Sequence, residues 1–325
     1  MATLVTGAFG CIGSWVVGRL LESGERPILY DLADDPWRLR MIVGPERLGH
    51  VTIVRGDVED GGRLAAVVGE HRITRIIHLA AWQIPLCRQD PVGGARVNVV
   101  GTANVFEAAR AYQDQVERVV YASSAAVFGP PHLYAPGPLA DDAPRMPFTQ
   151  YGAYKVANEE MARASWEEHR IPSSGFRPLS VYGPGRDVGL TADPTLAMKA
   201  AVLRRPFRIR WGGSSDLIYV DDVARALVTA AGARLDGARV YNLHGESAAV
   251  PDVVRLIEEA WPPARGRISY ANESIPLPAG LDDRAYQQDL GPAPRTSLKD
   301  GIRQSLEAFA RMQKEGRLDA RELEA

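Results

Sequence analysis

The stretch Met1-Ala-Thr-Leu-Val-Thr-Gly-Ala-Phe-Gly-Cys-Ile-Gly-Ser-Trp15 decides the fold. Leu4 and Val5 are strand formers, and apolar residues recur at helical spacing from Ile12 onward. Between strand and helix stand three glycines, Gly7, Gly10 and Gly13. A strand, a glycine turn and a helix in this order are typical of dinucleotide binding. Glycine lets the backbone approach a pyrophosphate closely, and the helix N-terminus stabilises the phosphate charge.

The glycine spacing is G-x-x-G-x-x-G, not the commoner G-x-G-x-x-G, and the alternative interpretation is an ordinary glycine-rich turn. Its position between a strand and an amphipathic helix favours the cofactor site. Further apolar runs predict strands over residues 27–31, 50–54, 73–79 and 119–122, separated by helical segments. This alternation predicts an α/β fold, a Rossmann-like doubly wound parallel sheet with a small C-terminal α/β lobe.

The composition excludes several classes of function. The chain has 325 residues and a net charge of -2, which gives no global electrostatic basis for binding nucleic acid or an anionic membrane. No apolar run is long enough to span a bilayer, and because a strand starts near Met1 we expect no signal peptide. Two cysteines, Cys11 and Cys87, are too few for a disulfide framework or a cysteine zinc site. We therefore expect a cytoplasmic protein without a metal.

Acidic residues close the second and third predicted strands. Asp31 comes about 20 residues after the glycine turn, where this fold reaches the adenosine ribose. Its carboxylate would accept hydrogen bonds from the ribose hydroxyls and repel a 2′-phosphate, which favours NAD over NADP. The alternative is a solvated turn acid, and the nearby Arg38 and Arg40 leave the cofactor preference open. Asp57 lies on the ligand side of the sheet and could accept from the adenine amino group.

Small residues follow the fourth predicted strand. Ala80 and Ala81 leave the backbone uncluttered beside the cofactor, and Trp82 and Gln83 come next, at the mouth of the expected cleft. His78 lies in an apolar strand and is interpreted as a packed core histidine. An expected helix over residues 91–112 carries Asn98.

A serine, a tyrosine and a lysine form the expected catalytic set. Ser124 follows the fifth strand, and Tyr151 and Lys155 lie four residues apart on one face of a helix. An ammonium beside a phenol lowers the phenol pKa, so Tyr151 would act as a general acid or base near neutral pH. Lys155 could also bind the nicotinamide ribose. Y-x-x-x-K often occurs by chance, and Tyr154 is the rival tyrosine, but its position on the helix favours a packing role.

With these motifs the chain resembles the extended short-chain dehydrogenases/reductases of the NAD-dependent epimerase/dehydratase family, over residues 3–309. The resemblance implies a bound NAD, hydride transfer at a carbinol carbon, a C-terminal substrate lobe and a homodimer formed by the helices at 91–112 and 151–169. The stretches 177–184 and 219–223 resemble later landmarks of the family. The cofactor contacts that we expect are Gly7, Phe9, Gly10, Cys11, Ile12, Gly13, Asp31, Asp57, Val58, Leu79, Ala80, Ala81, Asn98, Tyr151, Lys155, Pro178 and Val181.

The departures from the family pattern concern the substrate. Ala125 and Ala126 stand where the family's dehydratases carry Asp-Glu, so dehydration by that route is not expected. Ser180 replaces an asparagine usual in the nucleotide-sugar enzymes, and Ser215 replaces an arginine that grips the substrate diphosphate. These changes favour a substrate without a nucleoside diphosphate. The basic residues that could replace the missing arginine, or form a solvated face, are Arg186, Arg204, Arg205, Arg208 and Arg210.

A polar loop over residues 185–195 is expected to contact the substrate, because loops on a rigid scaffold commonly carry binding groups. The alternative for Thr191 or Asp193 is helix capping. The substrate contacts that we expect are Trp82, Gln83, Ser123, Ser124, Ser180, Arg186, Asp187 and Thr191. His132, His169 and His244 show no metal-ligand spacing, and Asp221-Asp222 is interpreted as the start of a helix.

The sequence therefore predicts an NAD-dependent oxidoreductase acting on a secondary alcohol of a sugar-like or polyol substrate. Two alternatives remain open, an epimerase that uses the same residues and a non-catalytic NAD-sensing protein. We expect residues 1–177 to form the NAD-binding Rossmann domain, with residues 216–245 returning to it. Residues 178–215 and 246–325 would form the substrate-binding lobe.

Overall fold

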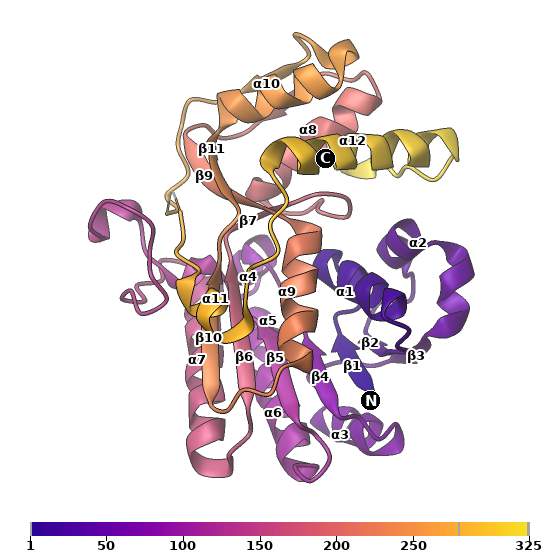
Figure 1. Ribbon diagram of the computed structural model, residues 1–325, viewed down its shortest axis with the longest axis vertical. Coiled ribbons are helices and arrows are strands. Elements are labelled where there is room, and N and C mark those ends of the chain that lie inside the picture. The colour runs from indigo at the N-terminus through magenta and orange to yellow at the C-terminus, as the bar shows by residue number, and fades with distance from the viewer. Residues whose placement is uncertain (1, 279, 324–325) are drawn as a thin grey trace.

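A seven-stranded parallel sheet organises the molecule (Figure 1). The structure is a computed structural model that describes residues 2–278 and 280–323, so Met1, Ala279 and residues 324–325 of the expected domains lie outside the described residues. The strand order is β3-β2-β1-β4-β5-β6-β10, and every neighbouring pair is parallel. The strands are β1 (Thr3–Thr6), β2 (Ile28–Asp31), β3 (Thr52–Arg55), β4 (Arg75–His78), β5 (Arg118–Ala122), β6 (Ser173–Pro178) and β10 (Ala238–Leu243).

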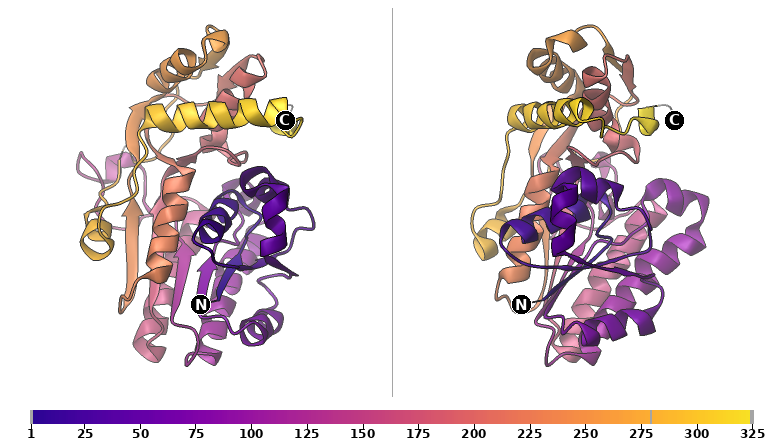
Figure 2. Two further views of the ribbon diagram at one scale, coloured as in Figure 1. Left: turned by 45° about the vertical axis from the view of Figure 1, so that its right-hand side comes forward. Right: turned by 90° about the vertical axis from the view of Figure 1, so that its right-hand side faces the viewer.

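Helices cover both faces of this sheet (Figure 2). Helices α1 (Cys11–Glu22) and α9 (Val220–Gly232) pack side by side on one face, and α2 (Trp37–Val43) packs against α1. Helices α3 (Gly61–Glu70), α6 (Gly101–Ala111) and α7 (Gln150–His169) cover the other face. The buried strands are apolar because both sheet faces are covered, as in Leu4, Val5, Ile76 and Ile77. The predicted doubly wound α/β fold is confirmed.

The helix expected over residues 91–112 contains a π-helical turn. It is built from α5 (Pro91–Ala95), the π-helical segment η2 (Arg96–Val100) and α6. Asn98 lies in the π turn, where its Nδ2 donates to Gly94 O at 2.9 Å and Thr102 Oγ1 donates to Asn98 O at 2.7 Å. Such turns are frequent at functional sites, and this one follows the helix α4 (Ile84–Gln89) that comes after the fourth strand.

A smaller lobe lies above the carboxyl ends of the large sheet, at the top of Figure 1. Helices α8 (Asp193–Val202), α10 (Val250–Ala260) and α12 (Leu298–Lys314) pack together there. The chain returns from this lobe through α9 and β10, and α11 (Arg284–Leu290) packs beside β10. The lobe's strands are β7 (Ser180–Tyr182), β9 (Ser214–Tyr219) and β11 (Glu246–Ala249) in one sheet and β8 (Phe207–Ile209) and β12 (Ile268–Tyr270) in another.

Short helical turns complete the described chain: η1 (Pro45–His50), η3 (Ala125–Val127), η4 (Pro131–Leu133), η5 (Leu190–Ala192), η6 (Pro262–Ala264) and η7 (Arg321–Leu323). Across residues 2–278 and 280–323, none of the helices combines the length and apolar character that crossing a membrane requires.

Candidate active site

The glycine turn is packed too tightly for side chains. Gly7 follows β1 with φ +65°, and a Cβ on it would lie 2.5 Å from the backbone nitrogen of Ala80. A Cβ on Gly13 would lie 2.2 Å from the carbonyl oxygen of Gly7. Gly10 is the N-cap of α1 and provides no side-chain cap, so the helix N-terminus is available for phosphate oxygens. The turn thus fits a dinucleotide pyrophosphate.

A buried network of hydrogen bonds joins β1, β4 and α6 next to this turn. Thr102 Oγ1 donates to Asn98 O, so it accepts from Nε2–H of His78 at 3.1 Å. Nδ1 of His78 then accepts from Thr6 Oγ1 at 2.7 Å, which makes the imidazole neutral. Thr6 Oγ1 in turn accepts from the backbone N–H groups of Leu79 and Ala80, at 3.3 and 3.4 Å. Burial, with the Lys155 charge, lowers the pKa of His78 to about 3.

Two carboxylates follow the strands on the adenosine side. Asp31 Oδ2 accepts from the Phe9 amide at 2.8 Å, and Oδ1 accepts from the Ala33 amide at 3.0 Å, which fixes the carboxylate beside the glycine turn. Asp57 Oδ1 accepts from the Glu59 amide at 2.9 Å in the turn after β3. Both side chains retain lone pairs for a further donor.

The remaining expected cofactor residues are spread along the same edge of the sheet. Val58 is buried against Gly101. Cys11 and Ile12 begin α1, Ala81 follows β4, Pro178 ends β6, and the buried Val181 lies in β7. Burial raises the pKa of the Cys11 thiol to about 12. Asn98 is itself buried and holds the loop after β4, because its Nδ2 also donates to Trp82 O at 3.2 Å.

Ser124, Tyr151 and Lys155 come together at the carboxyl end of β5. Ser124 caps η3 by accepting from the Ala126 amide at 3.1 Å, and its hydroxyl hydrogen-bonds the Tyr151 phenol. Tyr151 lies in the first turn of α7. The Lys155 ammonium lies 5.5 Å from the Tyr151 ring centroid and donates to Ala122 O at 2.7 Å. These three side chains could position a hydroxyl group and remove its proton.

The electrostatics differ from the sequence-based expectation in one respect. Burial raises the pKa of the Tyr151 phenol, and the groups that oppose this rise are Ser124, through its hydrogen bond, and Arg186, through its charge. In the free protein the Lys155 ammonium is not among the groups that oppose this rise, since it is desolvated and donates to a backbone carbonyl, and its expected lowering of the phenol pKa stays a prediction. Its own pKa is lowered to about 8.

A cavity of about 490 Å³ opens beside Tyr151. Residues from α4 and from the proline-rich segment before α7 line it, among them Cys87, Arg88, Pro147 and Phe148. Sequence reasoning missed this wall of the site, although the proline-rich segment ends directly before the catalytic tyrosine. Within the described part of the chain, no group of three or more His, Cys, Asp and Glu could hold a metal ion.

Two of the expected substrate residues point into buried contacts instead. Ser123 is buried and donates to Glu159 Oε1 at 2.5 Å, and Glu159 also forms a buried ion pair with Arg177 at 2.6 Å. Ser180 and Ser215 are fully buried and hydrogen-bond each other at 2.7 Å. The two positions that depart from the nucleotide-sugar pattern are therefore in contact with each other.

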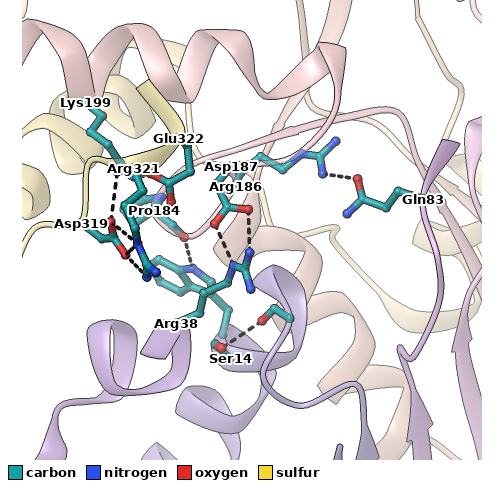
Figure 3. A network of polar contacts seen from close by, with 12 residues as sticks. Ser14, Arg38, Gln83, Pro184, Arg186, Asp187, Lys199, Asp319, Arg321 and Glu322 are labelled. Carbon is teal, nitrogen blue, oxygen red and sulfur yellow. Dashed lines mark hydrogen bonds and ion pairs between the residues drawn. The ribbon is translucent and has the colours of Figure 1, made fainter. Parts of the chain in front are cut away.

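The loop between β7 and α8 is tied to the cofactor half by side chains (Figure 3). Trp15 Nε1 donates to Pro184 O at 2.9 Å, and Arg38 forms a bidentate ion pair with Asp187 at 2.8 and 2.9 Å. The carboxylate of Asp187 is thus engaged. A Cβ on Gly185 would lie 3.7 Å from Cys11 Sγ, so the loop runs beside the glycine turn.

Three expected substrate residues meet in this loop region. Arg186 Nη1 donates to Gln83 Oε1 at 2.9 Å, and Nη2 donates to Thr191 Oγ1 at 3.0 Å. The capping alternative is not observed, since the N-cap of α8 is Ala192, without a side-chain cap. Asp193 instead pairs with Arg210 at 2.6 Å.

Comparisons with known proteins identify the family to which the chain belongs. The profile of the NAD dependent epimerase/dehydratase family matches residues 3–243. The chain is 33% identical to a UDP-glucose 4-epimerase of Mycolicibacterium smegmatis, over 95% of this chain and 98% of that protein. It is similar to the Thermus thermophilus UDP-glucose 4-epimerase complex with NAD, with 27% identity, a TM-score of 0.81 and coverage of 95% and 99%. A GalE-like L-threonine dehydrogenase from Cupriavidus necator gives 26% identity, a TM-score of 0.81 and coverage of 94% and 99%.

Proposed function

The chain belongs to the NAD dependent epimerase/dehydratase family of extended short-chain dehydrogenases/reductases, and we propose that it transfers hydride at a secondary alcohol through Ser124, Tyr151 and Lys155. It is an NAD-dependent enzyme. The observation that carries the proposal is the approach of these three side chains to one another at the carboxyl end of β5, with Tyr151 also lining the cavity. We propose the glycine turn, Asp31, Asp57 and the small residues after β4 as the cofactor contacts.

Each catalytic side chain has one role in the proposed reaction. Bound NAD supplies the carbon that accepts hydride. Tyr151 takes the hydroxyl proton while the carbinol C–H bond breaks, so a two-electron oxidation turns the alcohol into a ketone. Ser124 accepts from or donates to the reacting oxygen and holds it near the phenol. Lys155 would hold the nicotinamide ribose, and with the site filled its charge would favour the phenolate.

We favour net oxidation of a sugar-like or polyol alcohol, or the reverse reduction. The buried pair of Ser180 and Ser215 supports a substrate without a nucleoside diphosphate, because neither side chain offers a charge to a phosphate. The similarity to an L-threonine dehydrogenase supports net oxidation. The second candidate is an epimerase, which the 33% identity to a UDP-glucose 4-epimerase favours.

The first test is Tyr151→Phe, with Tyr154→Phe as the matched control. The Tyr154 phenol lies on the exposed side of α7 and donates to Pro91 O at 2.7 Å. We expect Tyr151→Phe to lower kcat by about 10²–10⁴-fold, with NAD affinity retained, and Tyr154→Phe to keep near wild-type turnover. Full activity in Tyr151→Phe would contradict the catalytic role and would agree with an NAD-sensing protein.

The second test separates the two net reactions. Free sugars, sugar acids, polyols and nucleotide sugars are incubated with the purified protein and NAD while NADH absorbance and product stereochemistry are followed. A dehydrogenase accumulates NADH in proportion to the ketone formed. An epimerase converts a nucleotide sugar with no net NADH, because the hydride returns to the other face of the ketone.

The assembly, the compartment and the domain division are further parts of the proposal. Val92 and Val100 are 64% and 47% exposed on the helix at 91–112, which supports a homodimer through this helix and α7. Light scattering at micromolar concentration tests it, and a monomer would contradict it. The two free cysteines support a cytoplasmic location. The return of α9 and β10 to the large sheet supports the division at residues 177, 216 and 245.

A further inference from the structure

Arg186 carries a cationic side chain whose hydrogen-bond partners in the described part of the chain are all neutral. Its Nη1 donates to the Gln83 amide oxygen (Figure 3), and its Nη2 donates to the Thr191 hydroxyl. Its Nε is buried and has no hydrogen-bond partner among the described residues. The adjacent carboxylate of Asp187 is turned to Arg38 instead. A guanidinium has five N–H donors, and the bonds to Gln83 and Thr191 use two of them.

The position of this guanidinium is the second observation. Gln83 is the N-cap of α4, and α4 contributes residues to the cavity beside Tyr151. The preceding residue, Gly185, runs past Cys11 in the glycine turn. Burial raises the pKa of both the Tyr151 phenol and the Cys11 thiol, and the charge of Arg186 opposes this rise in each. The guanidinium therefore lies near both the catalytic tyrosine and the start of α1 after the glycine turn.

A partly buried cation without a counter-charge is unfavourable in the free protein, because it loses solvation without gaining an ion pair. An anionic ligand would supply the missing counter-charge. The planar edge of a guanidinium matches the two oxygens of a carboxylate in a bidentate pair. A carboxylate carries one negative charge, which one guanidinium neutralises.

We propose that Arg186 binds a carboxylate of the substrate, so that the enzyme acts on a secondary alcohol that is also a carboxylic acid. The proposal rests on the proposed function, since it names the substrate class of the same site. Gln83 and Thr191 are positioning residues here, because their hydrogen bonds fix the orientation of the guanidinium.

The test compares acids with neutral counterparts. The probes are D-glucuronate, D-galacturonate, D-gluconate, 3-hydroxybutyrate and L-threonine, each beside its neutral sugar, alditol or amide. Arg186→Met and Arg186→Lys are compared with Arg303→Met, whose arginine lies exposed on α12 beside Asp300 and Glu307. We expect the wild type to prefer an acid, and Arg186→Met to lower kcat/KM for that acid by about 10²-fold or more. Arg186→Lys should restore part of it.

Binding and stability provide readouts that do not depend on turnover. Calorimetry on Tyr151→Phe loaded with NAD should detect the acids and not their neutral counterparts, and the added Arg186→Met change should abolish that binding. The dissociation constant for NAD should be the same in Arg186→Met and the wild type to within about threefold, which corresponds to less than 1 kcal/mol. In the free protein, Arg186→Met should leave the Tm unchanged or raise it, because it removes an uncompensated charge.

Several outcomes would overturn the proposal. One is that the enzyme converts neutral alcohols as efficiently as acids, or prefers a phosphate monoester. Another is that none of the five acids binds. A third is that the ratio of kcat/KM for an acid to that for its neutral counterpart is unchanged in Arg186→Met. A loss of NAD affinity equal to the loss of activity would assign Arg186 to the cofactor. The proposed function fails separately: hydride transfer that does not need Tyr151 contradicts it, whereas transfer that needs Tyr151 but ignores Arg186 contradicts this inference alone.

Discussion

The glycine turn over residues 7–13 and the loop over residues 183–192 run beside each other, and they are built differently. The turn is made of backbone: a Cβ on Gly13 would lie 2.2 Å from the Gly7 carbonyl oxygen. In the loop, a Cβ on Gly183 would lie 2.8 Å from a side-chain carbon of Val220, but a Cβ on Gly185 or Gly189 would meet its first neighbour at 3.7 and 3.5 Å. Those glycines are required by their φ angles of +94° and +90°, not by space.

The loop is instead positioned by long side chains, those of Trp15, Arg38 and Arg186. A turn formed by closely packed backbone atoms leaves no room for larger side chains, whereas contacts made by side chains can be changed by one substitution at a time. The difference explains how a family keeps one cofactor while its members act on different substrates. It predicts that changes in the turn have larger effects than changes in the loop.

The largest expected contrast is between Gly13→Ala and Gly185→Ala. Gly13→Ala forces backbone atoms apart, so it should destabilise the protein by about 3 kcal/mol, the upper end for overpacking, and abolish NAD binding. Gly185→Ala adds only a strained φ, which costs about 1–2 kcal/mol. Urea unfolding and NAD titration measure both. Equal losses in the two variants would contradict the comparison.

Acid should weaken the turn through His78. Its folded pKa of about 3 lies below its ordinary 6.5, so between these values the unfolded chain binds a proton that the folded chain does not. Stability is therefore lost as the pH falls below 6.5, and at pH 5 the loss from this group is about 2 kcal/mol. Protonation at Nδ1 would also break the bond from Thr6.

The measurement is the free energy of unfolding at pH 7 and pH 5 in the wild type and in His78→Asn. The variant should lose about 2 kcal/mol less than the wild type over this interval, whatever its stability at pH 7. His132→Asn is the control, because His132 is exposed on η4. If the wild type and His78→Asn lose equal stability, His78 is not the titrating group.

The contrast between the backbone-built glycine turn and the side-chain contacts of the loop also explains which features the sequence could predict. The parallel sheet, the glycine turn and the position of Ser124 at the end of a strand follow from local periodicity and from parallel strands ending at one edge, so they were predictable. The pairing of Arg38 with Asp187 joins residues 149 positions apart, and that of Arg186 with Gln83 joins residues 103 apart. Side-chain partners at such separations depend on final packing, which no spacing in the sequence encodes. The same is true of the buried pair formed by Ser180 and Ser215.

Cofactor preference tests the adenosine side of the turn. The Asp31 carboxylate is fixed by the Phe9 and Ala33 amides and retains lone pairs for the ribose hydroxyls. Asp31→Asn removes its charge, so we expect about tenfold weaker NAD binding, equal to 1.4 kcal/mol, and a smaller preference for NAD over NADP. Fluorescence titration with both cofactors measures it. An unchanged preference would support the alternative of a solvated turn acid.

The smallest expected effect belongs to the ion pair that ties the loop to the cofactor half. Arg38 and Asp187 have side chains 24% and 5% exposed, whereas the neighbouring pair of Arg40 and Asp35 is 46% and 60% exposed. A double-mutant cycle with Arg38→Met and Asp187→Asn should give a coupling energy of about 1 kcal/mol, and the same cycle with Arg40→Met and Asp35→Asn should give below about 0.5 kcal/mol. If the loop covers bound cofactor, NAD should dissociate about fivefold faster from Arg38→Met than from the wild type, because 1 kcal/mol corresponds to about that factor. Stopped-flow displacement measures this rate. Loss of stability with an unchanged dissociation rate would mean that the pair supports the fold but does not hold the loop over the cofactor.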